Sequence, residues 1–320
     1  RPYDVTAHTL PLLFGVDAAP VRKTFQAQAE RIVAPVPPVH RTRLPMADTD
    51  SWKRVAAAWK QNEPVYLNWR ESTFYLQSTP GAGRVPKPRI GIYQSWVPSM
   101  DEGWTRWILD AFGLEYQTLH NADILAGALA EGFDAIVLPD SSAAAIREGH
   151  GAADMPAEFT GGLGADGFLR LDEFVRAGGT AIYLNRAGLY PESLNVRNAL
   201  KDVSPNTYYC PGSLVWATLR QSHPLTMGLP SKVALWVDNQ SPAWELAEPR
   251  WQQSIAKYED RDPLASGWLL GGNHLTGKSP LVEVTRGKGS HILCGFRPQS
   301  RGQSYLTVKL LLNAFLRHLL

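Results

Sequence analysis

The chain is organised around one stretch of sequence: Asp172-Glu173-Phe174-Val175-Arg176-Ala177-Gly178-Gly179-Thr180-Ala181-Ile182-Tyr183-Leu184-Asn185-Arg186-Ala187-Gly188. Apolar residues at helical spacing before it predict a helix that ends at Gly178-Gly179. Residues 180–184 form a short apolar run, typical of a strand covered on both faces of a parallel sheet. Ligands of such sheets bind beyond the carboxyl ends of the strands. The turn at Asn185 and Arg186 therefore lies where a site is expected.

Strand-like and helix-like segments alternate from residue 88 onward. Strands are predicted at 89–93, 116–119 and 133–139, and helices are predicted from the Ser99 capping box and over 123–131. The buried stripe of the first helix is predicted to hold Trp104, Trp107, Ile108, Ala111 and Phe112. A Gly- and Ala-rich loop of more than about 20 residues is expected after residue 139. This rhythm predicts an α/β protein of the flavodoxin-like, three-layer kind, with a parallel sheet between helices.

The two ends of the chain follow other patterns. Further strands are predicted at 214–219, 234–237, 254–258, 280–284 and 290–294, before a closing helix over 305–319. Near the start, 3–7 and 10–16 are read as short strands or an extended arm, and a Pro-rich linker spans 34–46. A helix and two strands are predicted within 48–78. Pro and Gly at 80–88 then indicate a boundary between a small α+β segment, 1–85, and an α/β domain, 86–320.

Composition limits the classes of function. The 320 residues hold 32 Lys plus Arg and 30 Asp plus Glu, and a net charge of +2 speaks against nucleic acid as a partner. No apolar run approaches the roughly 20 residues needed to span a bilayer. The chain opens at Arg1 without Met, so we expect a segment of a longer protein. Two cysteines, Cys210 and Cys294, are too few for a disulfide framework or a Cys-based zinc site.

Two short segments with acidic residues border the expected crevice. Asp101 and Glu102 begin a helix just after the first strand, where they either cap the helix or bind a ligand. Asp140 and Ser141 follow the third strand. Ser141 could act as a nucleophile, but no Gly-x-Ser-x-Gly elbow surrounds it, and a simple turn explains the same residues.

Basic residues follow the last strand. Arg297 and Arg301 precede the final helix, an arrangement that favours an anion or carboxylate. The alternative is a pair of salt bridges that hold the final helix. None of the eight histidines lies in an H-x-x-E or H-E-x-x-H arrangement, so no metal site is expected within this chain.

The run 88–320 resembles the class I glutamine amidotransferase-like domains. The resemblance lies in residues 174–180 leading into a strand and sharp turn, and in residues 287–289 leading to 295–298. Members carry a nucleophilic Cys on the first turn, where this chain has Asn185. They carry a His-x-Glu pair after the second, where this chain reads Arg297-Pro298-Gln299. An amide and a guanidinium cannot replace a thiolate and its base, so we expect no glutaminase activity.

A second resemblance covers nearly the whole chain, to the C-terminal region of large bacterial zinc carboxypeptidase family proteins. It lies in residues 1–7, 10–12, 93–96, 100–107, 160–164 and 295–303. The resemblance implies that zinc is held only in a peptidase domain absent from this chain, through an H-x-x-E…H set, and that no cofactor is bound here. It also implies that domain as a partner, and a periplasmic or secreted location, which the residues alone leave unknown.

The leading hypothesis is a region that is not catalytic by itself and binds a peptide or small anionic ligand, or holds the parent enzyme together. The candidate crevice residues are Gln94, Glu102, Arg106, Asp140, Asn185, Arg297 and Arg301. One alternative is a hydrolase that uses Ser141. Another is an interaction module that docks through residues 1–85, for which exposed apolar side chains within 1–47 would be evidence.

Overall fold

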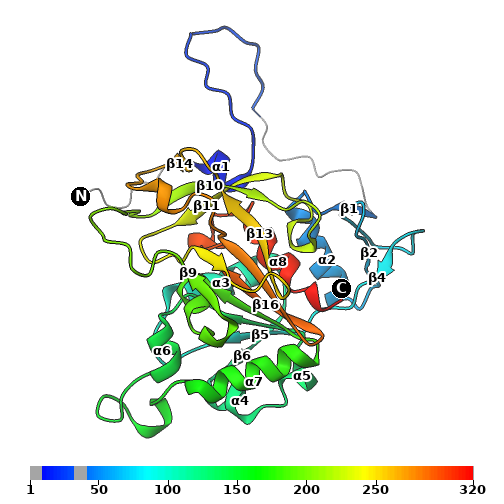
Figure 1. Ribbon diagram of the computed structural model, residues 1–320. Helices are drawn as coiled ribbons and strands as arrows, with labels where there is room; N and C mark the ends of the chain where they lie inside the picture. Colours follow the sequence, from blue (N-terminus) through cyan, green and yellow to red (C-terminus); the bar gives the residue numbers. More distant parts are fainter. Residues whose placement is uncertain (1–8, 32–41, 320) are drawn as a thin grey trace.

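The computed structural model describes residues 9–31 and 42–319, and a large mixed sheet runs through its body (Figure 1). Five of its strands are parallel, and in spatial order they are β6 (Tyr116–Leu119), β5 (Ile90–Tyr93), β7 (Ala135–Leu138), β8 (Thr180–Leu184) and β16 (Gly289–Cys294). Numbered along the chain, this order is 2-1-3-4-5, which is the flavodoxin-like arrangement. The predicted fold class is confirmed by this strand order.

Helices cover both faces of the parallel strands. The helices are α2 (Asp50–Lys60), α3 (Met100–Phe112), α4 (Asn121–Ala126), α5 (Leu129–Gly132), α6 (Ala143–Glu148), α7 (Gly164–Ala177) and α8 (Val308–Ala314). Ile182 of β8 packs in one core cluster with Ile108 of α3, while the next residue, Tyr183, packs in a second cluster with Leu171 of α7. Alternate residues of the strand therefore face different helix layers, which explains why every residue of β8 is buried.

Beyond β16 the sheet continues with antiparallel strands. These are β15 (Leu281–Arg286), β13 (Gln252–Tyr258), β10 (Ser213–Leu219) and β11 (Lys232–Val237), and β14 (Leu264–Ser266) also pairs with β10. A two-residue turn with Gly287 at φ 58° joins β15 to β16, and so short a turn permits only antiparallel pairing. All of these strands except β14 had been predicted. The parallel sheet predicted from the alternation after residue 88 is confirmed, and these antiparallel strands extend it into a mixed sheet.

A second, smaller sheet lies near the start of the chain. Its order is β1 (Arg43–Pro45), β3 (Thr73–Tyr75), β2 (Tyr66–Asn68) and β4 (Gly83–Arg84). The helix and two strands predicted within 48–78 are confirmed as α2, β2 and β3. Trp52 of α2 meets Phe74 of β3 edge to face, and both belong to the core cluster that contains α3 and α8 side chains. The division of the chain at residue 85 stays a prediction.

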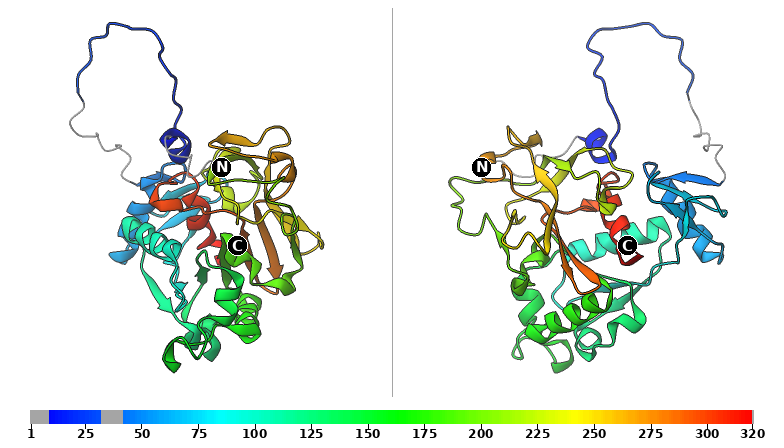
Figure 2. Two further views of the ribbon diagram at one scale, coloured as in Figure 1. Left: turned by 90° about the vertical axis from the view of Figure 1, so that its left-hand side faces the viewer. Right: turned by 45° about the vertical axis from the view of Figure 1, so that its right-hand side comes forward.

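The first described residues form a short helix, so the strand or extended arm predicted at 10–16 is wrong. In α1 (Leu10–Phe14), the ring of Phe14 stacks on Tyr305 at 4.9 Å, and the Leu13 carbonyl accepts a hydrogen bond from the backbone N–H of Leu306. Residues 15–31, here called the arm, then project from the body (Figures 1 and 2). The strand predicted at 3–7 and most of the Pro-rich linker lie outside the described residues.

Three local predictions differ from the structure. The long loop expected after residue 139 contains α6. The helix expected over 123–131 is two helices, because Gly127 and Ala128 take positive φ values of 77° and 56°. Trp107, expected on the buried face of α3, is 44% exposed. The buried face of α3 instead carries smaller residues, namely Asp101, Thr105, Ile108, Leu109 and Phe112.

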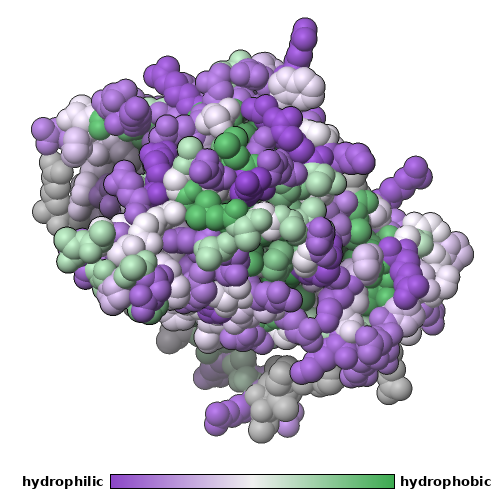
Figure 3. Space-filling model, turned by 90° about the horizontal axis from the view of Figure 1, so that it is seen from below, coloured by the Kyte–Doolittle hydropathy of each residue, from purple (hydrophilic) through white to green (hydrophobic). Residues whose placement is uncertain are grey.

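Hydrophilic residues cover most of the face seen from below, with hydrophobic residues gathered in a band between them (Figure 3). Within the described ranges, no helix is both long enough and apolar enough to cross a membrane.

Candidate functional site

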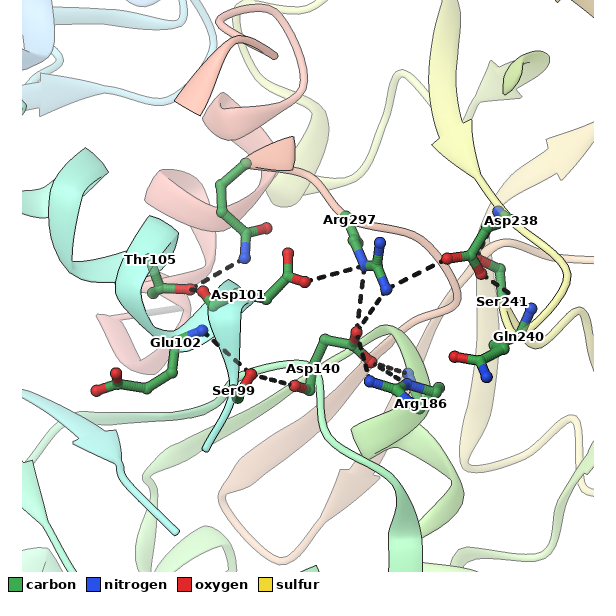
Figure 4. A network of polar contacts seen from close by, with 11 residues as sticks. Ser99, Asp101, Glu102, Thr105, Asp140, Arg186, Asp238, Gln240, Ser241 and Arg297 are labelled. Atoms are coloured by element: carbon green, nitrogen blue, oxygen red, sulfur yellow. Dashed lines mark hydrogen bonds and ion pairs between the residues drawn. The ribbon is translucent and has the colours of Figure 1, made fainter. Parts of the chain in front are cut away.

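The candidate site lies at the carboxyl ends of the parallel strands. The chain leaves β5 towards β6 on one side and reaches β7 on the other, so the order of strands reverses at β5. Open α/β sheets bind ligands at such a switch point. The turns after β5, β7, β8 and β16 carry Ser99, Asp140, Arg186 and Arg297, and Asp238 enters the same region from the end of β11 (Figure 4).

Asp140 is the centre of the site and is only 1% exposed. Its Oδ1 accepts hydrogen bonds from the backbone N–H of Arg186 at 3.1 Å and from Arg186 Nε at 2.8 Å, and Oδ2 accepts from Arg186 Nη2 at 3.1 Å. Oδ2 also accepts from Nη2 and Nε of Arg297, at 2.8 and 3.2 Å. One buried carboxylate therefore ties the turn after β7 to those after β8 and β16.

Arg297 joins two further carboxylates to this centre. Its Nε lies 3.2 Å from Asp101 Oδ2 in the first turn of α3, and its Nη2 lies 3.2 Å from Asp238 Oδ2. The guanidinium also lies over the Trp236 ring, 4.8 Å from its centroid. Arg297 therefore joins the turn after β16 to the first turn of α3, the turn after β7 and the end of β11 (Figure 4). We call Asp101, Asp140, Asp238, Arg186 and Arg297 the charged cluster.

The charged cluster shifts the ionisation of its members. Burial raises the pKa of Asp101 to about 6. The negative charges of Asp140 and Asp238 also raise this pKa, whereas the positive charge of Arg297 lowers it. Burial alone would also raise the pKa of Asp140, but the hydrogen bonds and charges of Arg186 and Arg297 outweigh it, so the pKa lies below its usual value. At neutral pH both are carboxylates, and Asp101 is the group that takes up a proton first on acidification.

Two adjacent cavities open beside the charged cluster, with Pro98, Ser99 and Ser141 lining both. The larger, of about 240 Å³, has as its lining Pro98, Ser99, Met100, Asp101, Trp104, Asp140, Ser141, Arg186, Arg297, Ser300 and Arg301. The smaller, of about 150 Å³, is lined by Gln94 and Glu102, among others. Five of the seven candidate residues therefore line these cavities, divided between the two.

The remaining two candidates lie elsewhere. Arg106 donates a hydrogen bond from Nε to Glu102 and lies 5.4 Å from the Tyr116 ring centroid, outside the lining of both cavities. Asn185 is fully buried directly after β8, and within the described part of the chain its Oδ1 and Nδ2 have no hydrogen-bond partner. Neither side chain is placed to contact a ligand in these cavities.

Asn185 stands where an amidotransferase-like turn would carry its nucleophile. Its φ of 50° is uncommon for a residue with a side chain, and a sharp strand-to-helix turn of this kind is the geometry of a nucleophile elbow. Neither thiol is on this turn: Cys210 precedes β10, and Cys294 ends β16, where it pairs with Leu184, the residue before Asn185. Burial raises the pKa of Cys210 to about 11 and that of Cys294 to about 12, so both stay protonated at neutral pH.

Two of the residues that stand in place of the His-x-Glu pair, Arg297 and Gln299, also make structural contacts. Arg297 belongs to the charged cluster, and the buried Gln299 donates from Nε2 to Thr105 Oγ1 at 3.0 Å. His223 is buried against Glu283, with Nε2 and Oε2 2.9 Å apart. No group of three or more His, Cys, Asp or Glu side chains within residues 9–31 and 42–319 is arranged to hold a metal ion.

Sequence reasoning missed part of the site. Asp101 had been weighed as a helix cap or a ligand-binding group, and Arg186 belongs to the turn where a site was expected, but neither was among the candidate crevice residues. Trp236 and Asp238 had drawn no attention. Trp236 lies in β11 and Asp238 follows it, and a strand had been predicted there. Only the antiparallel pairing of β11 with β10 brings the end of this strand to the site. An acidic residue directly after a predicted strand is the one signal that could have pointed to Asp238.

No family model matches this chain, and no curated protein matches it. Among solved structures, a ThuA-like protein from Bacteroides uniformis aligns over 74% of this chain and 94% of its own, at 13% identity and a TM-score of 0.41. PurLQS from Thermotoga maritima aligns over 73% of this chain and 100% of its own, at 14% identity and a TM-score of 0.48. A β-galactosidase from Bacillus circulans aligns over 71% of this chain but only 31% of its own, at 12% identity and a TM-score of 0.43. The fold assignment rests on the strand order described above.

Proposed function

We propose that this chain is a non-catalytic, amidotransferase-like region that binds a small anionic ligand and serves as an accessory part of a zinc metallocarboxypeptidase family protein. The observation that carries the first part is the elbow position: a buried amide, Asn185, follows β8, and neither of the two buried thiols is on this turn. The accessory role rests on the sequence resemblance alone.

The character of the ligand follows from the groups that face the larger cavity. The three carboxylates of the charged cluster engage Nε and Nη2 of Arg297, and Asp140 engages the same two nitrogens of Arg186. None of these contacts uses Nη1 of either arginine. Arg301 and the hydroxyl groups of Ser141 and Ser300 add further donors to the lining, while the Ser99 hydroxyl donates to the Asp140 carbonyl. A lining rich in N–H and O–H donors favours a ligand that accepts hydrogen bonds, such as a carboxylate or phosphate.

Calorimetric titration with acetate and with inorganic phosphate tests this binding. We expect Arg301→Gln to weaken both by about tenfold, because a hydrogen bond to a charged group contributes about 1.5–3 kcal/mol. Arg250→Gln removes an exposed arginine that lines neither cavity and is the matched control. Absence of binding to both anions, or equal affinity in the two variants, would refute the proposal.

Activity assays separate this proposal from the hydrolase alternative. Ser141 is largely buried and lines both cavities, but neither lining includes a histidine among the described residues. We expect no hydrolysis of glutamine, or of peptides with added zinc. Turnover of an ester or amide that Ser141→Ala abolishes would favour the hydrolase instead.

The arm supports a second candidate function, docking of another domain. Val21 and Phe25 are 68% and 71% exposed, and apolar side chains in that setting favour a partner surface. The partner that the sequence suggests is the peptidase domain. We expect Val21→Ser with Phe25→Ser to abolish co-elution of this chain with that domain in gel filtration. Co-elution that the double variant leaves unchanged would exclude the arm as the docking segment.

The proposal also covers where zinc is bound and in which compartment the protein lies. The resemblance favours a zinc ion held only by the H-x-x-E…H set of the peptidase domain, and a periplasmic or secreted protein. The upstream reading frame tests the first point, since a frame without that set would remove the peptidase link. Fractionation of the producing cells tests the second.

A further inference from the structure

The larger cavity is small for a whole ligand. Its volume of about 240 Å³ is below the roughly 300–1,000 Å³ of pockets that bury drug-sized molecules. Four of its lining residues, Asp101, Asp140, Arg186 and Arg297, point toward one another (Figure 4). A ligand larger than a bare anion would therefore place its charged group in the cavity and the rest of the molecule outside.

An apolar stripe on α3 begins at this cavity. Met100, Trp104 and Trp107 are spaced i, i+4 and i+7, which puts them on one face of the helix. Met100 and Trp104 line the cavity, and Trp107 lies one turn further along the helix. Met100 is 78% exposed and Trp107 44% exposed, so the stripe is open to solvent.

The stripe is tied to the arginine side of the cavity. The rings of Trp104 and Trp107 meet edge to face, with centroids 6.2 Å apart. Gly302, the residue after Arg301, packs so closely on Trp107 that a Cβ there would lie 2.6 Å from the indole ring. Single exposed apolar residues are ordinary on protein surfaces. Three in a row that lead out of a donor-lined cavity form a continuous surface for one ligand.

We propose that this site binds an amphipathic carboxylate, whose carboxylate enters the larger cavity and whose aromatic ring lies on the α3 stripe. The inference rests on the proposed anion binding and adds the class of ligand. An aromatic ring suits this surface because indole rings pair favourably with other rings in edge-to-face and offset geometry. Trp104 belongs to both the cavity and the stripe, so the two parts of the ligand are adjacent.

Three probes separate the two parts of the ligand: acetate has the head group alone, 3-phenylpropan-1-ol has the ring alone, and 3-phenylpropionate has both. We expect 3-phenylpropionate to bind about tenfold more tightly than acetate, since an aromatic pair adds about 0.5–1.5 kcal/mol beyond buried area. The alcohol should show no measurable binding. Acetate affinity is obtained by competition with 3-phenylpropionate where direct titration is too weak.

Two tryptophan variants test the stripe. Trp107→Ala should reduce the advantage of 3-phenylpropionate over acetate to about twofold or less, while leaving acetate binding unchanged. Trp268→Ala removes an indole of similar exposure, 49%, that lines neither cavity, and it should leave the advantage intact. Circular dichroism and the urea midpoint confirm that each variant is folded.

The outcomes distinguish the two proposals. Equal affinity for acetate and 3-phenylpropionate, or an equal loss in both tryptophan variants, overturns the stripe and leaves anion binding in place. Binding of 3-phenylpropionate that Arg301→Gln does not weaken overturns the placement of the carboxylate. Failure of acetate, phosphate and 3-phenylpropionate alike refutes the proposed function itself. A stripe that binds none of the probes but buries Trp107 in a complex with another protein would also overturn the inference.

Discussion

Replacing Asp140 by Asn should destabilise the protein by about 3 kcal/mol, because it removes the charge that holds two arginines together. Removing one partner of a buried ion pair costs about 3–5 kcal/mol. Arg297 keeps Asp101 and Asp238 after the substitution, whereas Arg186 loses its carboxylate and is partly exposed, so water can reach it. The expected loss therefore lies at the lower end of that range. It remains large against the roughly 5–15 kcal/mol that stabilise most domains.

Equilibrium unfolding in urea at pH 7, followed by circular dichroism and tryptophan fluorescence, measures this loss. Glu192→Gln is the control, because it removes the carboxylate of an ion pair with Arg147 in which the two side chains are 36% and 74% exposed. An exposed pair contributes less than about 1 kcal/mol. A loss in Asp140→Asn no larger than that of the control would refute the view that the charged cluster holds the turns together.

The pH dependence of the same difference supplies a second check. The pKa of Asp140 is lowered in the folded state, so its stabilising effect is present above the unfolded pKa of about 3.9 and is lost as the pH falls through the folded pKa. The difference between wild type and Asp140→Asn should therefore be complete at pH 7 and shrink below about pH 4. A difference that stays constant to about pH 3 would show that the side chain acts through its shape alone.

Three further predictions concern other buried groups. Because burial raises the pKa of Asp101 to about 6, above its unfolded pKa of about 3.9, stability is lost as the pH rises from the lower value through the higher one. The urea midpoint of Asp101→Asn should therefore gain on wild type between about pH 4 and 7 and stay level above that. Lys309 donates to two backbone carbonyls at 2.8 and 3.1 Å, and burial lowers its pKa to about 8. Lys309→Met should cost about 1–3 kcal/mol in urea unfolding and remove the rise in stability from about pH 8 to 10. Cys210 and Cys294 should stay unreactive towards a thiol reagent in the native protein and react in denaturant; rapid native reaction would contradict their burial.

The sequence was most informative where one pattern had one physical solution. The run 180–184 is apolar at every position, and only a strand between two helix layers buries both of its faces. The same reasoning held for β5 and β7. It failed at α1, where Leu10–Phe14 is too short for helical periodicity to appear, and at Trp107, where a large apolar residue stands on the exposed side of a helix. Local patterns cannot show which face of a helix meets the core at its ends.

The candidate site was predicted less completely, for a reason of connectivity. Asp140 and Arg297 were expected together because parallel strands end at one edge of the sheet. Asp238 follows β11, which is antiparallel to β10, and nothing local to the sequence indicates which edge its end would reach. Asn185 shows the opposite difficulty: its place directly after the central strand was predicted, but its side chain is enclosed and lines neither cavity.

The charged cluster supports the proposal that this chain binds a ligand and performs no covalent chemistry. A nucleophile elbow works when its side chain is open to the substrate and a base is within hydrogen-bond reach. Here the residue at the elbow is buried, and the place where a base would stand is taken by Arg297, which three carboxylates hold. These contacts fix the orientation of the two arginines before any ligand arrives, which lowers the ordering cost of binding an anion. Preorganised donors beside an open apolar stripe are the features of a recognition site, and the chemistry of this chain is in keeping with that role.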